Sequence, residues 1–374
     1  MVEYNLNGMK IYIDEADSND KVYVSLSFGS GYSTRFIRVK EEKIFIGAAT
    51  AKLIANYKKN VIKEKLGIGI KTLCSMNATT FYWSVDKDEV SLQSMKIIKE
   101  VLNFETNKEL FQNVKTETMK SFANNYKDVA FRSEFKIFEK GYEDTGYNLN
   151  LLCMDLQQID QKKIELGIKY LFNYQNMFLY IHGLGGDIIE KLKADYTSKS
   201  TPIEIIFESD EPKYISDAYI VKSAYKNYFQ GCLSLKKIEM EENRSKELAI
   251  MSILSHRFFQ NSFNITLSQR SISIIYNERR KYGEKEEFLL EIQESDLAEA
   301  RKILKDSLDN IFLKSEELVY TVGQLLFSNV NFFEVYHTII NIDMLSINQY
   351  INVSKYTISE SVLIHEEREF EDVY

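Results

Sequence analysis

The pattern of apolar and polar positions predicts strands and amphipathic helices along most of the chain. Residues 22–28 alternate between the two classes and end at Gly29-Ser30-Gly31, which is typical of a strand followed by a turn. Residues 79–85 are β-branched and aromatic, as in a strand. Residues 41–59 predict a helix, in which alanines at 48, 49, 51 and 55 would allow close packing against a neighbour.

Two segments repeat one strand-and-helix unit. Residues 81–102 predict a short strand followed by a helix whose apolar positions form one stripe. Residues 288–308 repeat this order, with a strand, an acidic cap and a helix. The two halves of the chain therefore resemble each other.

A second repeat is clearer, because six residues recur at a constant offset of 183 positions. Both copies predict a helix, a short polar link and a strand. Chance similarity between two ordinary helix–strand units is the alternative, but identical spacing over six positions favours a true duplication. An offset this long indicates duplicated domains and not a solenoid, whose repeat unit is roughly 20–50 residues. The recurring residues are Ile159, Asp160, Ile164, Ile168, Ile181 and His182, matched by Ile342, Asp343, Ile347, Ile351, Ile364 and His365.

Proline positions suggest where the chain divides. Both prolines, Pro202 and Pro212, lie near the middle and follow the polar stretch 197–201. We therefore expect an N-terminal domain over residues 1–196, a linker over 197–212 and a C-terminal domain over 213–374. The element order predicts an α+β fold, in which each domain has a mainly antiparallel sheet packed with helices.

Composition excludes several classes of protein. A formal net charge of −8 argues against nucleic-acid binding and mainly favours solubility, although it could also attract a basic peptide. The three cysteines, Cys74, Cys153 and Cys232, are widely spaced in apolar sequence and are expected to be buried thiols of a reducing compartment. The polar first 21 residues do not resemble a signal peptide, and no apolar run is long enough to span a membrane. We expect a cytoplasmic protein.

The predicted elements occur in the order found in the insulinase/pitrilysin-type metallopeptidases. A strand ending in GSG, a helix, a strand reading SMNATTFYWSV and an amphipathic helix resemble the N-terminal domain of that family. Residues 77–82 look like a compressed form of the family's Asn-Ala-x-Thr strand motif. Residues 174–183 (YQNMFLYIHG) resemble its stretch of tyrosine, asparagine and methionine that leads into a strand and a glycine. The resemblance implies two duplicated insulinase-like domains that form one half of a clamshell.

The zinc motif of that family is missing. Active members carry H-x-x-E-H on the first helix, where two histidines bind Zn²⁺ and the glutamate activates water. Aligning the family's Gly-x-Ala start with residues 47–49 places Thr50, Leu53 and Ile54 at the His, Glu and His positions. The downstream glutamate ligand would fall near Val114, with Glu117 close by. We therefore expect no catalytic residue, metal or cofactor in this chain, and zinc in a partner subunit.

A relocated zinc site is not expected either. The chain has four histidines, His182, His256, His337 and His365, and none lies near the first helix. No two are four residues apart, the spacing that would place two ligands on one helical face.

The resemblance also implies how a zinc-free subunit would contribute to a shared site. In the family, the zinc-free half supplies an arginine followed about seven residues later by a tyrosine, which can polarise a scissile carbonyl. Arg270 and Tyr276 match in type, with a spacing of six. The alternative is a solvated surface arginine and a half-buried strand tyrosine.

The leading hypothesis is a non-catalytic subunit of a heterodimeric zinc peptidase that helps to bind peptide substrate. Expected substrates are leader peptides of ribosomally made, modified peptides, or short peptides in general turnover. One alternative is a scaffold subunit without peptidase output. Another is a homodimeric peptide-binding protein without protease activity.

Overall fold

The computed structural model describes most of the chain and divides it into two compact units. The described residues are 2–6, 9–15, 20–141, 148–195, 203–207, 217–223, 229–237, 243–260, 263–267, 271–277, 288–351 and 356–367. Unit 1 consists of Met1–Ala123, Asn150–Glu208 and Asp309–Phe332. Unit 2 consists of Asn124–Leu149, Ser209–Leu308 and Phe333–Tyr374. Each unit thus contains a helical segment from the other half of the sequence.

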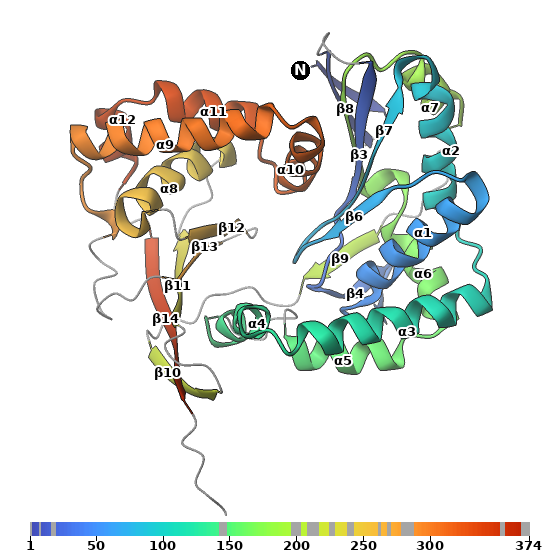
Figure 1. Ribbon diagram of the computed structural model, residues 1–374, viewed down its shortest axis with the longest axis horizontal. Helices are drawn as coiled ribbons and strands as arrows, with labels where there is room; N and C mark the ends of the chain where they lie inside the picture. Colours follow the sequence, from blue (N-terminus) through green and yellow to red (C-terminus); the bar gives the residue numbers. More distant parts are fainter. Residues whose placement is uncertain are drawn as a thin grey trace, which may run out of the picture. The chain divides into compact units, whose positions relative to one another are not determined.

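Unit 1 contains two sheets and most of the helices of the N-terminal half (Figure 1). Its strands are β1 (Val2–Leu6), β2 (Met9–Asp14), β3 (Lys21–Phe28), β4 (Thr34–Val39), β5 (Glu42–Phe45), β6 (Lys71–Cys74), β7 (Thr79–Asp86), β8 (Met177–His182) and β9 (Ile203–Phe207). Its helices are α1 (Thr50–Leu66), α2 (Val90–Leu102), α5 (Leu149–Gln158), α6 (Gln161–Leu171), α7 (Ile188–Asp195), α10 (Ser315–Phe327) and most of α3 (Lys108–Asn125), with short 3-10 turns at Lys87–Glu89 and Tyr174–Asn176.

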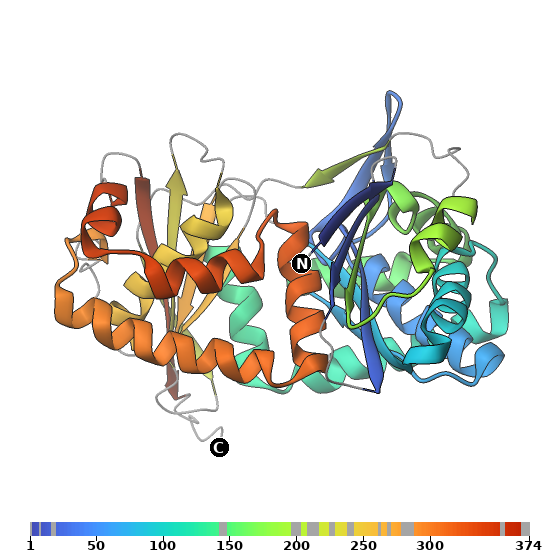
Figure 2. The ribbon, with the colours of Figure 1, turned by 90° about the horizontal axis from the view of Figure 1, so that it is seen from above.

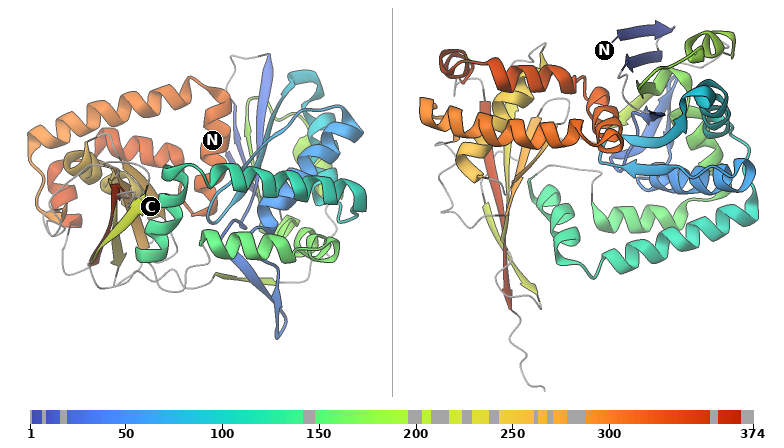
Figure 3. Two further views of the ribbon diagram at one scale, coloured as in Figure 1. Left: turned by 60° about the horizontal axis from the view of Figure 1, so that its bottom comes forward. Right: turned by 45° about the horizontal axis from the view of Figure 1, so that its top comes forward.

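Unit 2 is built in the same way around one sheet. Its strands are β10 (Asp217–Ser223), β11 (Phe229–Lys237), β12 (Phe263–Leu267), β13 (Ser271–Tyr276) and β14 (Tyr356–Glu367). Its helices are α4 (Val129–Gly141), α8 (Arg244–Phe259), α11 (Phe332–Asn341), α12 (Met344–Tyr350) and most of α9 (Glu294–Phe312). Helix α4 packs on β11 and β14 (Figure 3, left).

The strand order confirms the α+β fold with duplicated domains. The six-stranded sheet of unit 1 has the order β1-β2-β8-β3-β7-β6, and the sheet of unit 2 has the order β10-β14-β11-β13-β12. Without the edge strand β1, both sheets place their strands in the chain order first, fifth, second, fourth and third. In both, the first and fifth strands are parallel and the other neighbours are antiparallel. One topology is therefore present twice.

The repeat in the sequence has a physical counterpart at the start of two helices. The side chain of Asp160 accepts a hydrogen bond from the Lys163 amide at 2.8 Å and caps α6. Asp343 does the same for α12, accepting from the Ser346 amide at 2.6 Å. An aspartate at this position satisfies one of the amide groups that a helix leaves without a partner, so both copies begin in the same way.

Helix α10 covers one face of the large sheet of unit 1. Because side chains alternate along a strand, Val24 and Trp83 share one face, where the Trp83 indole donates to the Ser94 hydroxyl of α2 at 3.2 Å. Ser25, Ser27 and Thr80 lie on the opposite face, which α10 crosses. Short side chains there allow the helix to approach closely.

Two polar contacts hold α10 to this face. The Gln324 amide donates to the Thr80 hydroxyl at 2.7 Å, and the Thr80 and Ser27 hydroxyls share a hydrogen bond of 2.7 Å. Gly323 lies over the two serines: a Cβ added there would be 2.6 Å from the Ser27 hydroxyl and 2.9 Å from that of Ser25. A residue larger than glycine therefore does not fit at this position without movement.

The helix predicted over residues 41–59 begins later than expected. Residues Glu42–Phe45 form β5, which pairs with β4 so that Phe36 lies opposite Phe45. Gly47 has φ of +99°, a conformation that side chains disfavour, and α1 starts only at Thr50. The predicted helix included this strand and the turn at Gly47, so its predicted start was wrong.

The strand predicted at the beginning of 288–308 is also absent. Phe288 and Leu289 are buried. Carbonyl groups of this segment accept hydrogen bonds from a side chain and not from a neighbouring strand. The Arg257 guanidinium donates to the carbonyls of Phe288, Leu290 and Glu291 at 2.9–3.1 Å. Helix α9 then starts at Glu294, as the acidic cap predicted.

The predicted linker 197–212 contains a strand. Residues Ile203–Phe207 form β9, which pairs with β4 in the three-stranded sheet β5-β4-β9 of unit 1 (Figure 2). The flanking residues 196–202 and 208–216 lie outside the described residues. Within the part of the chain that the structure describes, no helix is both long and apolar enough to cross a membrane.

Candidate functional site

The first helix of unit 1 carries the positions where the zinc motif would lie. Its start is set by the turn at Gly47, whose carbonyl accepts from the Thr50 amide at 3.0 Å. It ends at Gly67, which has the left-handed conformation of a helix C-cap with φ of +67°. Thr50, Leu53 and Ile54, which the resemblance predicts as the motif positions, lie in the first two turns of α1.

All three side chains face the interior of unit 1. Thr50, Leu53 and Ile54 each have 0% relative exposure. The Thr50 hydroxyl donates to the carbonyl oxygen of Ile46 at 2.8 Å, so it is already used within the local turn. Leucine and isoleucine have no lone pair to offer a metal ion.

The buried face of α1 packs directly on α6. A Cβ built on Gly167 would be 2.8 Å from Thr50 Cγ2 and 2.9 Å from Ile54 Cδ1. Real Cβ atoms do not come this close to neighbours, so the two helices meet at a contact that only glycine permits. We call the contact formed by Thr50, Ile54 and Gly167 the α1–α6 seam.

The position predicted for the downstream glutamate lies on α3 and is also apolar. Val114 is buried, and Thr118, one helical turn later, is buried on the same face. The Thr118 hydroxyl accepts from the Asn56 amide of α1 at 2.9 Å, which places this face of α3 next to α1. Glu117 is exposed, so it does not share the face that contacts α1.

A buried ion pair fixes the turn that precedes α1. Asp155 of α5 accepts from Arg35 Nε at 2.8 Å and from Arg35 Nη2 at 3.3 Å. The same carboxylate accepts from the Ala48 amide at 2.9 Å. Asp155 thus connects β4, α5 and the start of α1, and a two-point arginine contact of this kind fixes geometry as well as charge. Sequence reasoning missed this pair, because Arg35 and Asp155 are far apart in the chain.

These residues do not fit a zinc ion. A catalytic zinc needs three nitrogen, sulfur or oxygen ligands and a free position for water. Of the four matching positions, three carry the apolar side chains of Leu53, Ile54 and Val114. The fourth carries the Thr50 hydroxyl, which is already hydrogen-bonded. Among the described residues there is also no cluster of three His, Cys, Asp or Glu side chains placed to hold a metal.

Comparison with solved structures identifies the fold. The chain is similar to a protein named as an M16-like peptidase from Alicyclobacillus acidocaldarius, with a TM-score of 0.78, 13% identity and coverage of 98% of both chains. The chain has the M16 peptidase fold. Neither a family model nor a curated protein sequence matches it.

Two further solved structures are also similar to this chain. The inactive domain of an M16 peptidase from Pseudomonas fluorescens has a TM-score of 0.69 and 13% identity, with coverage of 98% of this chain and 99% of that one. The periplasmic protease PqqL from Escherichia coli has a TM-score of 0.67 and 12% identity. That match covers 98% of this chain but 46% of PqqL, so this chain spans about half of that protease.

The pair predicted to bind substrate is described only in part. Arg270 lies outside the described residues. Tyr276 is 1% exposed, stacks on Phe259 with ring centroids 4.3 Å apart, and donates its hydroxyl to the Glu360 carboxylate. Its ring lies over Gly231, where a Cβ would be 2.0 Å from the ring. The phenol therefore points into the core of unit 2, and its predicted role in substrate binding stays a prediction.

The thiols differ in burial. Cys232 is fully buried, as predicted, while Cys74 and Cys153 are half-buried, and all three are free. Burial raises the pKa of both the Cys74 and Cys232 thiols to about 11. Both therefore remain protonated near neutral pH and are poor nucleophiles.

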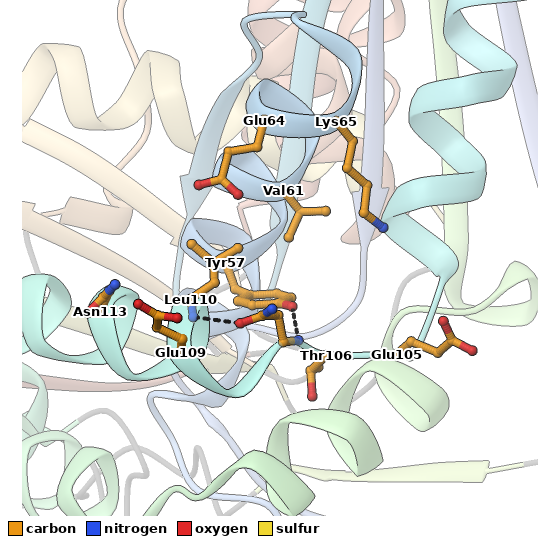
Figure 4. A pocket seen from close by; sticks show the side chains of 10 residues that line it. Tyr57, Val61, Glu64, Lys65, Glu105, Thr106, Glu109, Leu110 and Asn113 are labelled. Carbon is orange, nitrogen blue, oxygen red and sulfur yellow. Dashed lines mark hydrogen bonds between the residues drawn. The ribbon is translucent and has the colours of Figure 1, made fainter.

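A pocket of about 540 Å³ opens beside the second half of α1 (Figure 4). The Tyr57 ring forms part of it, and the Tyr57 hydroxyl accepts from the Asn107 amide at 2.7 Å. Glu64, Glu105 and Glu109 are exposed around it. The first α1 residue that lines the pocket is Tyr57, three residues beyond the last motif position, Ile54.

A buried lysine secures α1 to the adjoining helix. Lys58 is fully buried, and its ammonium donates to the carbonyl oxygens of Glu100, at 2.8 Å, and of Asn103. Burial lowers the pKa of Lys58 to about 8. Because the last carbonyls of a helix lack partners within the helix, Lys58 caps the C-terminal end of α2. A lysine inside an otherwise apolar helical stripe is the signal by which the sequence could have revealed it.

His182 takes part in a contact between two parallel strands. Its Nδ1 lies 3.1 Å from the Asp14 carboxylate, which also accepts from the Tyr180 hydroxyl at 3.5 Å. The hydrogen bond with His182 lowers the pKa of Asp14 below its ordinary value. Asp14 and His182 are directly paired at the end of β2 and β8, which fits a structural role.

Proposed function

We propose that this chain is the non-catalytic subunit of a heterodimeric zinc peptidase and that it helps to bind the peptide substrate. The observation that carries the proposal is the apolar, packed face of α1 within a complete M16 fold. A chain that keeps both duplicated domains but offers no metal ligands at the motif positions can act in proteolysis only through a partner that supplies the zinc.

The similar structures support pairing. This chain is equivalent in length to about half of PqqL, and we propose that a second, similar chain supplies the other half. The M16 inactive domain has nearly the same length as this chain. Within the proposal, the partner is a homologous subunit with an intact H-x-x-E-H helix, and the substrates are leader peptides of ribosomally made, modified peptides.

The contribution of Arg270 gives a direct test. In the complex with the zinc-bearing subunit, Arg270→Ala should lower kcat for peptide cleavage by about 10²–10³-fold, the loss seen when one oxyanion donor is removed. Cleavage is measured with saturating peptide, and complex formation is checked by size-exclusion chromatography. Arg38→Ala, at an exposed position on β4, is the matched control and should leave kcat unchanged.

The result separates the proposal from its alternatives. Equal cleavage by the Arg270→Ala and wild-type complexes would contradict a shared site. A stable complex that never cleaves peptide would instead favour a scaffold subunit. Tight peptide binding by this chain alone, with no cleavage in any complex, would favour a peptide-binding protein.

A further inference from the structure

The buried face of α1 lacks metal-binding side chains and is also packed against a neighbouring helix. Thr50 and Ile54 contact α6 at Gly167, where even one added carbon would lie 2.8–2.9 Å from their methyl groups. The Thr50 hydroxyl faces its own turn and bonds to the Ile46 carbonyl. The space beside these side chains is therefore occupied by another helix.

We infer that α6 packs against the face of α1 where a metal ion would have to bind. Restoring the ligand residues alone would therefore not restore a zinc site. A zinc ion with three protein ligands lies about 2.0–2.2 Å from each ligand atom and needs further room for its water. An imidazole is wider than the isoleucine tip that already touches Gly167. Close-packed interiors do not provide such space without moving a helix.

Both ends of the seam region are held, so α1 cannot easily move away from α6. Before the helix, Asp155 accepts from the Ala48 amide and from two nitrogens of Arg35. Further along, Asn56 is bonded to Thr118 and Lys58 to the end of α2. A displacement large enough for a metal would break several of these contacts at once.

This inference concerns the seam and goes beyond the proposed function, because the wild-type chain could lack zinc whether or not the site is recoverable. The first test is a fourfold variant that restores the motif: Thr50→His, Leu53→Glu, Ile54→His and Val114→Glu. After incubation with excess zinc and gel filtration, metal analysis should find no stoichiometric zinc on the folded fraction. One zinc per folded chain would overturn the inference and leave the proposed function standing.

The second test measures the seam without any metal and decides the matter if the fourfold variant does not fold. Gly167→Ala should lower the Tm of unit 1 by about 2–10 °C in the wild-type chain, the cost of overpacking one carbon. Helix propensity cannot cause this fall, since alanine favours a helix more than glycine does. In a Thr50→Ser/Ile54→Val background, which removes both contacting methyl groups, the same change should lower the Tm much less.

The design has a probe and a control within the chain. Trp83 is the single tryptophan and lies in unit 1, so its fluorescence follows the unit that contains the seam. Gly69→Ala is the matched control, because an added Cβ there has no neighbour within 4 Å, and it should leave the Tm unchanged. An equal effect of Gly167→Ala in both backgrounds, or none in the wild type, would overturn the inference.

Discussion

Asp155→Ala should lower the free energy of unfolding of unit 1 by about 3 kcal/mol, because the change removes one partner of a buried ion pair. Asp155 is 2% exposed and holds both Arg35 and the Ala48 amide. The estimate takes the lower end of the usual range, since Arg35 keeps some contact with solvent. Urea unfolding followed by Trp83 fluorescence measures the loss in the unit concerned.

Two further variants show whether charge or packing is responsible. Arg35→Met/Asp155→Leu should be less damaging than Asp155→Ala alone, because no charged group remains without its partner. Glu316→Ala is the control: its ion pair with Lys71 is exposed and screened by solvent, so its removal should have a much smaller effect on stability. Equal losses of unfolding free energy in Asp155→Ala and Glu316→Ala would show that the contacts of Asp155 stabilise unit 1 no more than an exposed ion pair does.

Gly323→Leu should destabilise unit 1 by about 3 kcal/mol or more, because the new side chain meets the sheet under α10. A Cβ at this position already comes within 2.6 Å of Ser27 and 2.9 Å of Ser25, and leucine adds three more carbons. Urea unfolding monitored at Trp83 again reports the change. The contacts of Phe327 with Phe178 and of Gln324 with Thr80 would be lost if the helix moved outward.

The same substitution at Gly69 provides the control for this prediction. Gly69 is exposed and has no neighbour within 4 Å of an added Cβ, so Gly69→Leu should change stability by less than about 0.5 kcal/mol. Similar losses for the two leucine variants would show that α10 does not pack on the sheet as described.

Local sequence patterns predicted the elements whose structure depends on residues close together in the chain. The strands at Val22–Phe28 and Thr79–Val85 were predicted by alternation and β-branching, and both are present in β3 and β7. The repeat predicted equivalent positions for the aspartates at 160 and 343, and the structure shows that each caps a helix by accepting from an amide three residues further along. The duplication was predicted by spacing and confirmed by the shared strand order.

The errors occurred where a distant group decided the local structure. No pattern within residues 288–292 shows that Arg257 will bond to their carbonyls in place of a strand. The start of α1 depends on the pairing of β5 with β4 and on the turn at Gly47. The assignment of α4 and α10 to units from the other half of the chain rests on long-range packing alone.

The candidate site was predictable in composition but not in packing. Aligning residues 47–49 with the family's motif showed that Thr50, Leu53 and Ile54 are poor ligands. That Gly167 closes the same face follows only from the crossing of α6, some 110 residues further along the chain. The strand alternation that predicts Tyr276 as a strand residue cannot say which face is covered, and the structure shows it in contact with Phe259 and Glu360.

The most direct test is the metal content and peptidase activity of the purified chain on its own. After incubation with zinc and removal of free metal, we predict no stoichiometric zinc by metal analysis and no cleavage of a peptide library by mass spectrometry. One zinc per chain together with cleavage by this chain alone would contradict the account. It would mean that replacing the zinc-motif residues by Thr50, Leu53, Ile54 and Val114 does not abolish metal binding and catalysis.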